Sequence, residues 1–113
     1  MIETTEVEFA GQKWEASFDF QQVAALKEVF HRLSLGNAPD FYSEKVIDDF
    51  KTALAARIKD QLSVIVISLR RRHPGVTRED LSKIMKIGEL DGVTVEILKM
   101  VPRVLNPKEA SNG

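Results

Sequence analysis

Few residues in this chain could carry chemistry, and their spacing fits no catalytic or metal-binding pattern. His31 and His73 are the only imidazoles, and neither has a second His or an Asp at the spacing of a metal site or a catalytic triad. Asp48 and Asp49 are adjacent carboxylates on an expected helix. Neighbouring helical side chains point about 100° apart, so these two do not converge on a substrate. We therefore expect a protein that is not an enzyme and uses no cofactor or metal.

One basic cluster stands out between two expected helices. We call it the basic corner, and it consists of Arg70, Arg71, Arg72 and His73, with Arg78 shortly after it. Positive side chains suit the end of a helix, where they complement the last carbonyl groups and the helix dipole. The same side chains could grip phosphates or an acidic patch on a partner protein.

The alternation of apolar and polar residues over positions 4–18 predicts a β-hairpin. A two-residue loop at Gly11-Gln12 suits a type II′ turn and would place Phe9 opposite Trp14. The apolar residues then fall on one face, which comprises Val7, Phe9, Trp14, Ala16 and Phe18. The three aromatic members of this face are candidate anchors for a partner, although core packing is the more common use. The open edges could also extend a partner's sheet.

The rest of the chain predicts about four helices. Asp19 would cap the first, over 20–33, and Ser43 the second, a long helix that ends near Arg72. The β-branched run at 64–67 favours a strand locally, but the apolar stripe continues through it as in a helix. That stripe comprises Ile47, Phe50, Leu54, Ile58, Leu62, Ile65 and Leu69.

The basic corner separates the long helix from the last two. Pro74-Gly75 breaks the chain, and Thr77 would cap a third helix to about Lys86, with Leu81, Ile84 and Met85 pointing inward. Gly88 and Gly92 would bracket a turn. Residues 94–105 fit either a strand or a helix, and we favour a helix that Pro102 would kink or end.

The composition predicts a single soluble domain. The chain has 113 residues, no cysteine, and a net charge of −1 from 16 basic and 17 acidic residues. This balance creates no global field that would attract nucleic acid or a membrane. No apolar run is long enough to span a membrane, and the N-terminus does not resemble a signal peptide. We expect a cytoplasmic α+β domain, mostly α, over residues 1–105, followed by a flexible polar tail over 106–113.

Two segments together resemble a known family. A strand-Gly-Gln-strand hairpin over residues 7–18 leads into one helix and then a long one, which ends at His-Pro-Gly-Val-Thr-Arg-Glu-Asp-Leu (73–81). This arrangement resembles the small tail assembly chaperones of long-tailed bacteriophages and the related proteins of prophages and gene transfer agents. The resemblance covers about residues 3–105.

The resemblance implies a non-enzymatic protein in the cytoplasm of a bacterial host, absent from the finished virion. It would bind the tape measure protein, keep that long apolar helical protein soluble, and help recruit tail tube protein subunits around it. A homo-oligomer is plausible, because a chaperone for a long filament must present many copies. The candidate contact residues are Phe9, Trp14 and Phe18 for apolar capture, and Arg70, Arg71, Arg72 and His73 for acidic patches.

Two other functions remain open at this stage. One is a small helix-turn-helix regulator that would use residues 77–105 to bind DNA. The second helix of that pair, however, offers few donors for base edges or phosphates over 94–99. The other is a phage accessory or inhibitor protein that docks on a host complex. The position of the gene relative to tail tube and tape measure genes would separate these readings.

Overall fold

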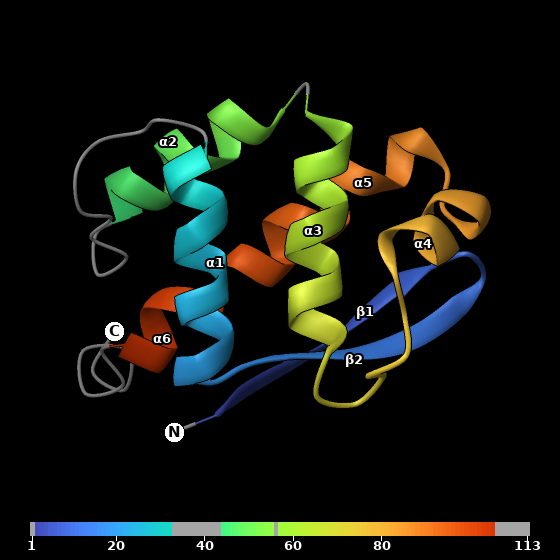
Figure 1. Cartoon of the computed structure of the whole chain (residues 1–113), viewed down its shortest axis with the longest axis horizontal. Helices are drawn as coiled ribbons and strands as arrows, with labels where there is room; N and C mark the ends of the chain where they lie inside the picture. The colour runs from blue at the N-terminus through green and yellow to red at the C-terminus, as the bar shows by residue number, and fades with distance from the viewer. Residues whose placement is uncertain (1, 33–43, 56, 106–113) are drawn as a thin grey trace.

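The fold begins with a β-hairpin that is followed only by helices. A computed structural model describes residues 2–32, 44–55 and 57–105. The predicted class, α+β and mostly α, is confirmed (Figure 1). In chain order the elements are β1 (Glu3–Phe9), β2 (Gln12–Phe18), α1 (Phe20–Arg32), α2 (Glu44–Leu54), α3 (Ile58–Leu69), α4 (Arg78–Ile84), α5 (Ile87–Leu98) and α6 (Val101–Leu105).

The hairpin forms as expected, but its register differs by two residues. Phe9 lies opposite Gln12 and Val7 opposite Trp14, so the predicted pairing of Phe9 with Trp14 is wrong. The loop is Ala10-Gly11, and both residues have positive φ, 55° and 72°. This geometry belongs to a type I′ turn rather than type II′. Because side chains alternate with a period of two, a shift of two residues keeps the same apolar face inward.

A contact from a distant helix explains the position of this turn. The backbone N–H of Ala10 donates to Oε2 of Glu89 at 3.1 Å, and Oε1 of Glu89 accepts from the backbone N–H of Lys86 at 2.8 Å. The N–H of Lys86, and after it that of Ala10, lower the pKa of Glu89 because both stabilise the carboxylate. One side chain at the start of α5 thereby caps its helix and holds the hairpin turn.

The first helix forms as predicted, except that Phe20, the first residue of its predicted apolar stripe, is 61% exposed. The side chain of Asp19 caps α1 by accepting a hydrogen bond from the backbone N–H of Gln22 at 2.8 Å. Val23, Leu26 and Phe30 are buried, as their spacing indicates. The predicted stop over 36–39 and the predicted cap at Ser43 lie outside the described residues.

The single long helix expected after residue 43 is wrong, because α2 and α3 are separate helices. The backbone N–H groups of Ala55 and Arg57 bond to carbonyl groups three residues earlier, so the chain turns tightly there. A continuous helix of 30 residues would be about 45 Å long, whereas the longest dimension of the molecule is 36 Å. The break lets Phe50 on α2 pack edge-on against Phe30 on α1, with ring centroids 5.3 Å apart. It also leaves Ile58, a predicted stripe residue, 44% exposed.

The last three helices correct two further expectations. Thr77 caps α4, as predicted, by accepting a hydrogen bond from the backbone N–H of Asp80 at 3.1 Å. Ile84, however, is 44% exposed rather than inward, since it ends this short helix. Gly88 and Gly92 do not bracket a turn, because both lie inside α5.

Residues 94–105 are helical, as favoured, but they belong to two helices. α5 ends at Leu98 and α6 begins at Val101, so Pro102 lies in the first turn of α6. A proline there costs no helical hydrogen bond, since N–H groups of the first turn have no partner within the helix. The expected long helix and the expected helix over 94–105 are each divided in two. The structure therefore describes six helices where four were expected.

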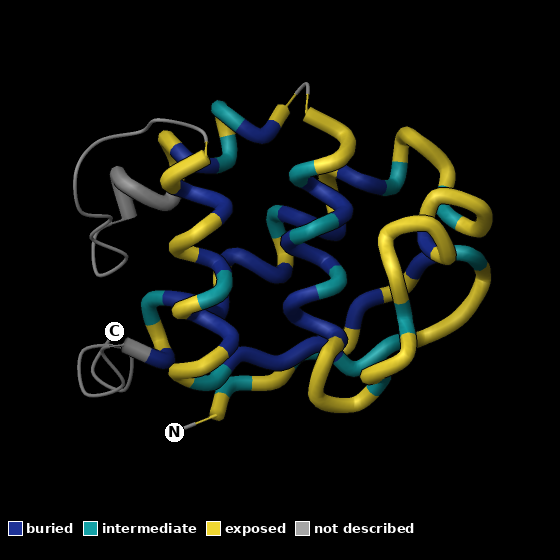
Figure 2. The backbone as a smooth tube through the Cα atoms, viewed as in Figure 1, coloured by how far each residue is buried: buried dark blue, intermediate teal, exposed yellow. Residues whose placement is uncertain are grey.

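Helix α3 is the centre of the fold. It lies side by side with α1, and α5 passes behind it, while the hairpin crosses below (Figure 1). Val64, Ile65 and Leu69 of α3 are fully buried, and Figure 2 shows the buried segments of α1, α3 and α5 turned toward one another. Burial on several sides explains why the β-branched run is helical here: tertiary packing outweighs a weak local preference.

Candidate functional site

The basic corner and the hairpin contact each other directly. The indole of Trp14 lies between two rings. It stacks on Phe9 with centroids 4.7 Å apart and planes 3° apart, and it meets the edge of His73 at 5.0 Å. Its Nε1–H donates to the backbone carbonyl of Phe9 at 3.3 Å. His73 is therefore part of the hairpin's packing.

Two arginines of the corner also turn toward the hairpin. Arg72 Nε lies 3.3 Å from Oε1 of Glu15, and Arg71 Nη1 lies 3.5 Å from Oδ2 of Asp19. Both arginine side chains are about half exposed, 59% and 47% respectively. Exposed pairs of this kind each contribute at most about 1 kcal/mol. They nevertheless fix the direction in which these side chains point.

A buried polar contact joins the same elements beneath the surface. The side-chain amide of Gln22 on α1 donates to the backbone carbonyl of Ile67 at 2.8 Å, near the end of α3. Its Oε1 accepts from the hydroxyl of Ser17 at 3.4 Å and from the backbone N–H of Asp19 at 3.1 Å. Gln22 and Ser17 are buried. This network ties β2, α1 and α3 together just before the corner.

The aromatic residues predicted as partner anchors have unequal exposure. Phe9 and Phe18 are 1% and 0% exposed and belong to the core. Trp14 is partly exposed but packs against the core. The hairpin thus uses its apolar face internally, and a partner that binds the folded chain cannot reach the side chains of Phe9 and Phe18.

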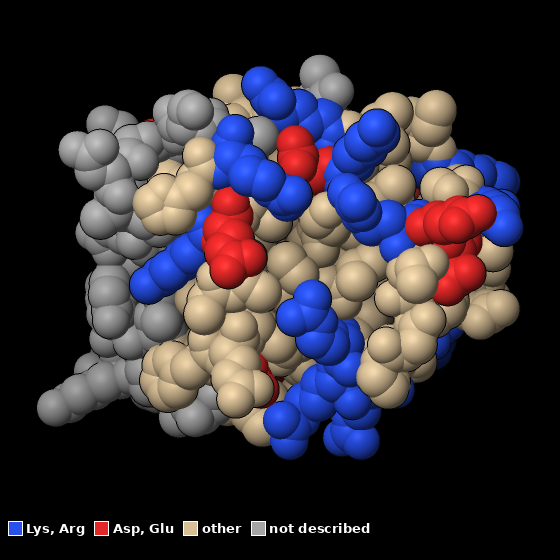
Figure 3. Space-filling view, in the orientation of Figure 1, with Lys and Arg blue, Asp and Glu red and all other residues tan. Residues whose placement is uncertain are grey.

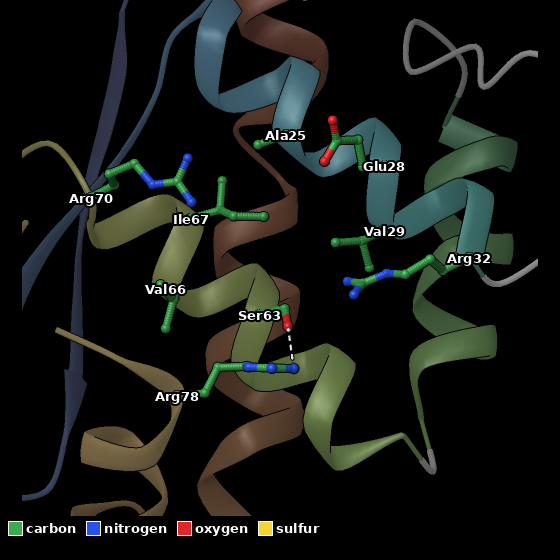
Figure 4. A pocket seen from close by; sticks show the side chains of 9 residues that line it. All are labelled: Ala25, Glu28, Val29, Arg32, Ser63, Val66, Ile67, Arg70 and Arg78. Carbon is green, nitrogen blue, oxygen red and sulfur yellow. Dashed lines mark hydrogen bonds between the residues drawn. The ribbon is translucent and has the colours of Figure 1, made fainter.

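The open surface near the corner is a groove between α1 and α3. Its volume is about 470 Å³. The floor is aliphatic, and a serine, a glutamate and three arginines line the sides. Figure 3 shows basic side chains around a hollow on this face, and Figure 4 shows the lining residues from close by. They are Ala25, Glu28, Val29, Arg32, Ser63, Val66, Ile67, Arg70 and Arg78.

The three groove arginines come from three different elements. Arg70 follows α3 and has no ion pair among the residues that the structure describes. Arg78 begins α4 and donates from Nη1 to the hydroxyl of Ser63 at 3.3 Å. Arg32 ends α1 and lies 3.7 Å from Asp60. In Figure 4 all three guanidinium groups extend toward the groove. The structure therefore separates Arg70 from the rest of the basic corner and joins it to Arg32 and Arg78.

Most of this groove cannot be predicted from the sequence. Arg32 and Ser63 belong to no motif that marks a site, and Val66 continues an apolar run. The only available signal was the basic residue at each helix end, which is also explained by the helix dipole. These helix ends line one groove because α1 and α3 are neighbours in the fold, and the sequence alone does not predict that neighbourhood.

The other candidate sites have less structural support than the groove. No group of three or more His, Asp or Glu residues within 2–32, 44–55 and 57–105 could hold a metal ion. The expected DNA-reading helix, 94–105, begins inside α5, where Thr94, Ile97 and Leu98 are buried. These side chains could reach base edges only if the helix left the core. Within the described ranges, none of the helices has the length and apolar character needed to cross a membrane.

Comparison with known proteins identifies no relative. No protein-family model matches the chain, and no curated protein or solved structure is significantly similar to it.

Proposed function

We propose that this protein is a non-enzymatic tail assembly chaperone of the kind found in long-tailed bacteriophages and prophages. It would act in the cytoplasm of a bacterial host. There it binds the tape measure protein, keeps that protein soluble, and helps recruit tail tube subunits around it. The resemblance of the hairpin and the basic corner to that family supplies the identity of the partners.

The observation that carries this proposal is the groove between α1 and α3. An open groove with an aliphatic floor and a basic rim suits a stretch of another protein that presents apolar and acidic side chains. The floor includes the partly exposed Val66 above the buried Val29 and Ile67, and the arginines stand around it. A chaperone needs such a surface, because it must cover apolar residues of its client without folding them into its own core.

The contact between the two family-like segments supports the same proposal. Trp14 of the hairpin packs on His73 of the corner, and Arg72 pairs with Glu15. The resemblance thus rests on one continuous structural unit, with the groove beginning at its edge.

The test is co-expression with the tape measure protein that this proposal assigns as the partner. We expect the tape measure protein to stay soluble and to co-purify with the chaperone, whereas alone it should aggregate. A tape measure protein that is equally insoluble with and without this chain would contradict the proposal.

A further inference from the structure

The direction of the two helices fixes the geometry of the groove. Arg32, at the end of α1, lies beside Asp60 at the start of α3, while Gln22 near the start of α1 reaches Ile67 near the end of α3. The helices are therefore antiparallel. On each segment the first and last lining residues are seven residues apart, from 25 to 32 and from 63 to 70, which corresponds to about 10 Å of helix.

The charges lie at defined places along these 10 Å. Arg70 stands at the end of α3 near Ala25, and Arg32 stands at the opposite end near Asp60. Arg78 enters from the α4 side, where it bonds to Ser63 (Figure 4). Among the described residues of the lining, Glu28 is the only acidic one, and it comes from α1.

We propose that this groove binds about two turns of an amphipathic α-helix from a partner protein, apolar side down. Carboxylates seven residues apart on that helix would reach Arg70 at one end and Arg32 with Arg78 at the other, because seven residues span the same 10 Å. Apolar side chains at the third and fourth positions between them would lie over the partly exposed side chain of Val66, with the buried side chains of Val29 and Ile67 beneath it.

The composition of the groove favours a helix over a nucleotide or nucleic acid. None of the described residues that line it is aromatic, so these residues offer a base no ring to stack on. The floor is aliphatic, and Glu28 would repel a phosphate chain that follows the groove. A single amphipathic helix instead matches an apolar floor and separated charges. The inference rests on the proposed function only for the partner's identity, which would be the tape measure protein.

The experiment measures binding of a labelled synthetic helical peptide to the full chain by fluorescence anisotropy. The peptide has leucines at two central positions and glutamates seven residues apart around them, and the matched peptide has lysines in place of the glutamates. We expect the lysine peptide to bind at least tenfold more weakly, and high salt to weaken the glutamate peptide. Equal binding of the two peptides would overturn the proposal.

Variants then locate the site. The double variant Arg70→Glu with Arg78→Glu should weaken the glutamate peptide at least tenfold, while Arg103→Glu, at an exposed position on α6 outside the groove lining, should change it less than twofold. Glu28→Gln should strengthen binding, since it removes the one opposing charge. Circular dichroism melts of all variants separate loss of binding from loss of folding. If the double variant folds and binds the glutamate peptide as tightly as the parent does, the peptide does not bind in this groove.

Three further outcomes separate this inference from the proposed function. If the tape measure protein co-purifies with the Arg70→Glu, Arg78→Glu variant as well as with the parent, the groove inference fails and the chaperone proposal stands. If the peptide binds through these arginines but the tape measure protein does not co-purify, the chaperone proposal fails and the groove inference stands. Duplex DNA that binds through the same arginines, with no binding of the peptide, would overturn the groove inference.

Discussion

Arg70 and Arg72 stand two positions apart, yet the first lines the groove between α1 and α3 and the second pairs with Glu15 on the hairpin. Successive residues at a helix end point about 100° apart, so a run of like charges is divided between faces. The hairpin side also has a ring contact through His73 and a buried network through Gln22. The groove side has an open surface. The comparison shows that four adjacent basic residues need not form one patch.

The largest effect is expected where the hairpin side is packed most tightly. Trp14→Ala removes a ring that stacks on Phe9 and contacts His73, and it should lower the free energy of unfolding by about 3 kcal/mol. Trp14→Phe retains a ring but loses the hydrogen bond to the carbonyl of Phe9, so it should recover most of the stability. Denaturant unfolding measures both. An alanine variant as stable as the parent would contradict the role of the hairpin side.

A smaller loss is expected from the buried network. Gln22→Leu removes the donor to the carbonyl of Ile67 and the acceptor for Ser17 and for the N–H of Asp19. Leaving such buried groups unpaired should cost about 2 kcal/mol of unfolding free energy. Gln21→Leu, at the exposed neighbouring position, is the matched control and should be nearly neutral. Equal losses in the two variants would mean that the network does not hold the corner.

The smallest effect concerns the far end of the hairpin and depends on pH. The pKa of Glu89 is lowered in the folded chain, so the stabilisation from its carboxylate is present above its ordinary pKa and is lost as the pH falls through the lowered value. Glu89→Gln should therefore be less stable than the parent at neutral pH, and the two should converge in acid. Glu8→Gln, at an exposed position on β1, is the matched control for the removal of one carboxylate from this region. If the difference in stability between Glu89→Gln and the parent were the same at all pH values, the carboxylate of Glu89 would not stabilise the hairpin turn.

Local sequence patterns predicted an element well where one apolar face and one capping side chain determine its structure. The hairpin face, the Asp19 and Thr77 caps and the core residues of α1 follow from alternation, helical spacing and short polar side chains. The turn type did not follow, because Glu89 contacts Ala10 from 79 residues away in the sequence. The break between α2 and α3 could not be predicted from local sequence either, because Ala55 and Arg57 are ordinary helix formers. The turn is required instead by the size of the domain, which is shorter than one continuous helix would be.

The candidate site was predicted only in part, for a related reason. Arg70 was identified from the basic run, but Arg32 and Arg78 join it only because α1, α3 and α4 meet. The net charge of the chain also gave no indication that basic side chains gather in one groove. A second hollow, between β1 and α5, is lined by Glu6, Glu8, Glu89 and Glu96. A chain of net charge −1 can thus carry separate basic and acidic surfaces.

The most direct test of the division within the basic corner compares Arg70→Glu with Arg72→Glu in one binding assay. Both variants make the same change of charge two positions apart, and the titrant is the glutamate peptide or the tape measure protein. The groove account predicts that Arg70→Glu alone weakens binding about tenfold and that Arg72→Glu changes it less than twofold, with both chains folded. Equal weakening by the two variants, or a larger loss from Arg72→Glu, would contradict it.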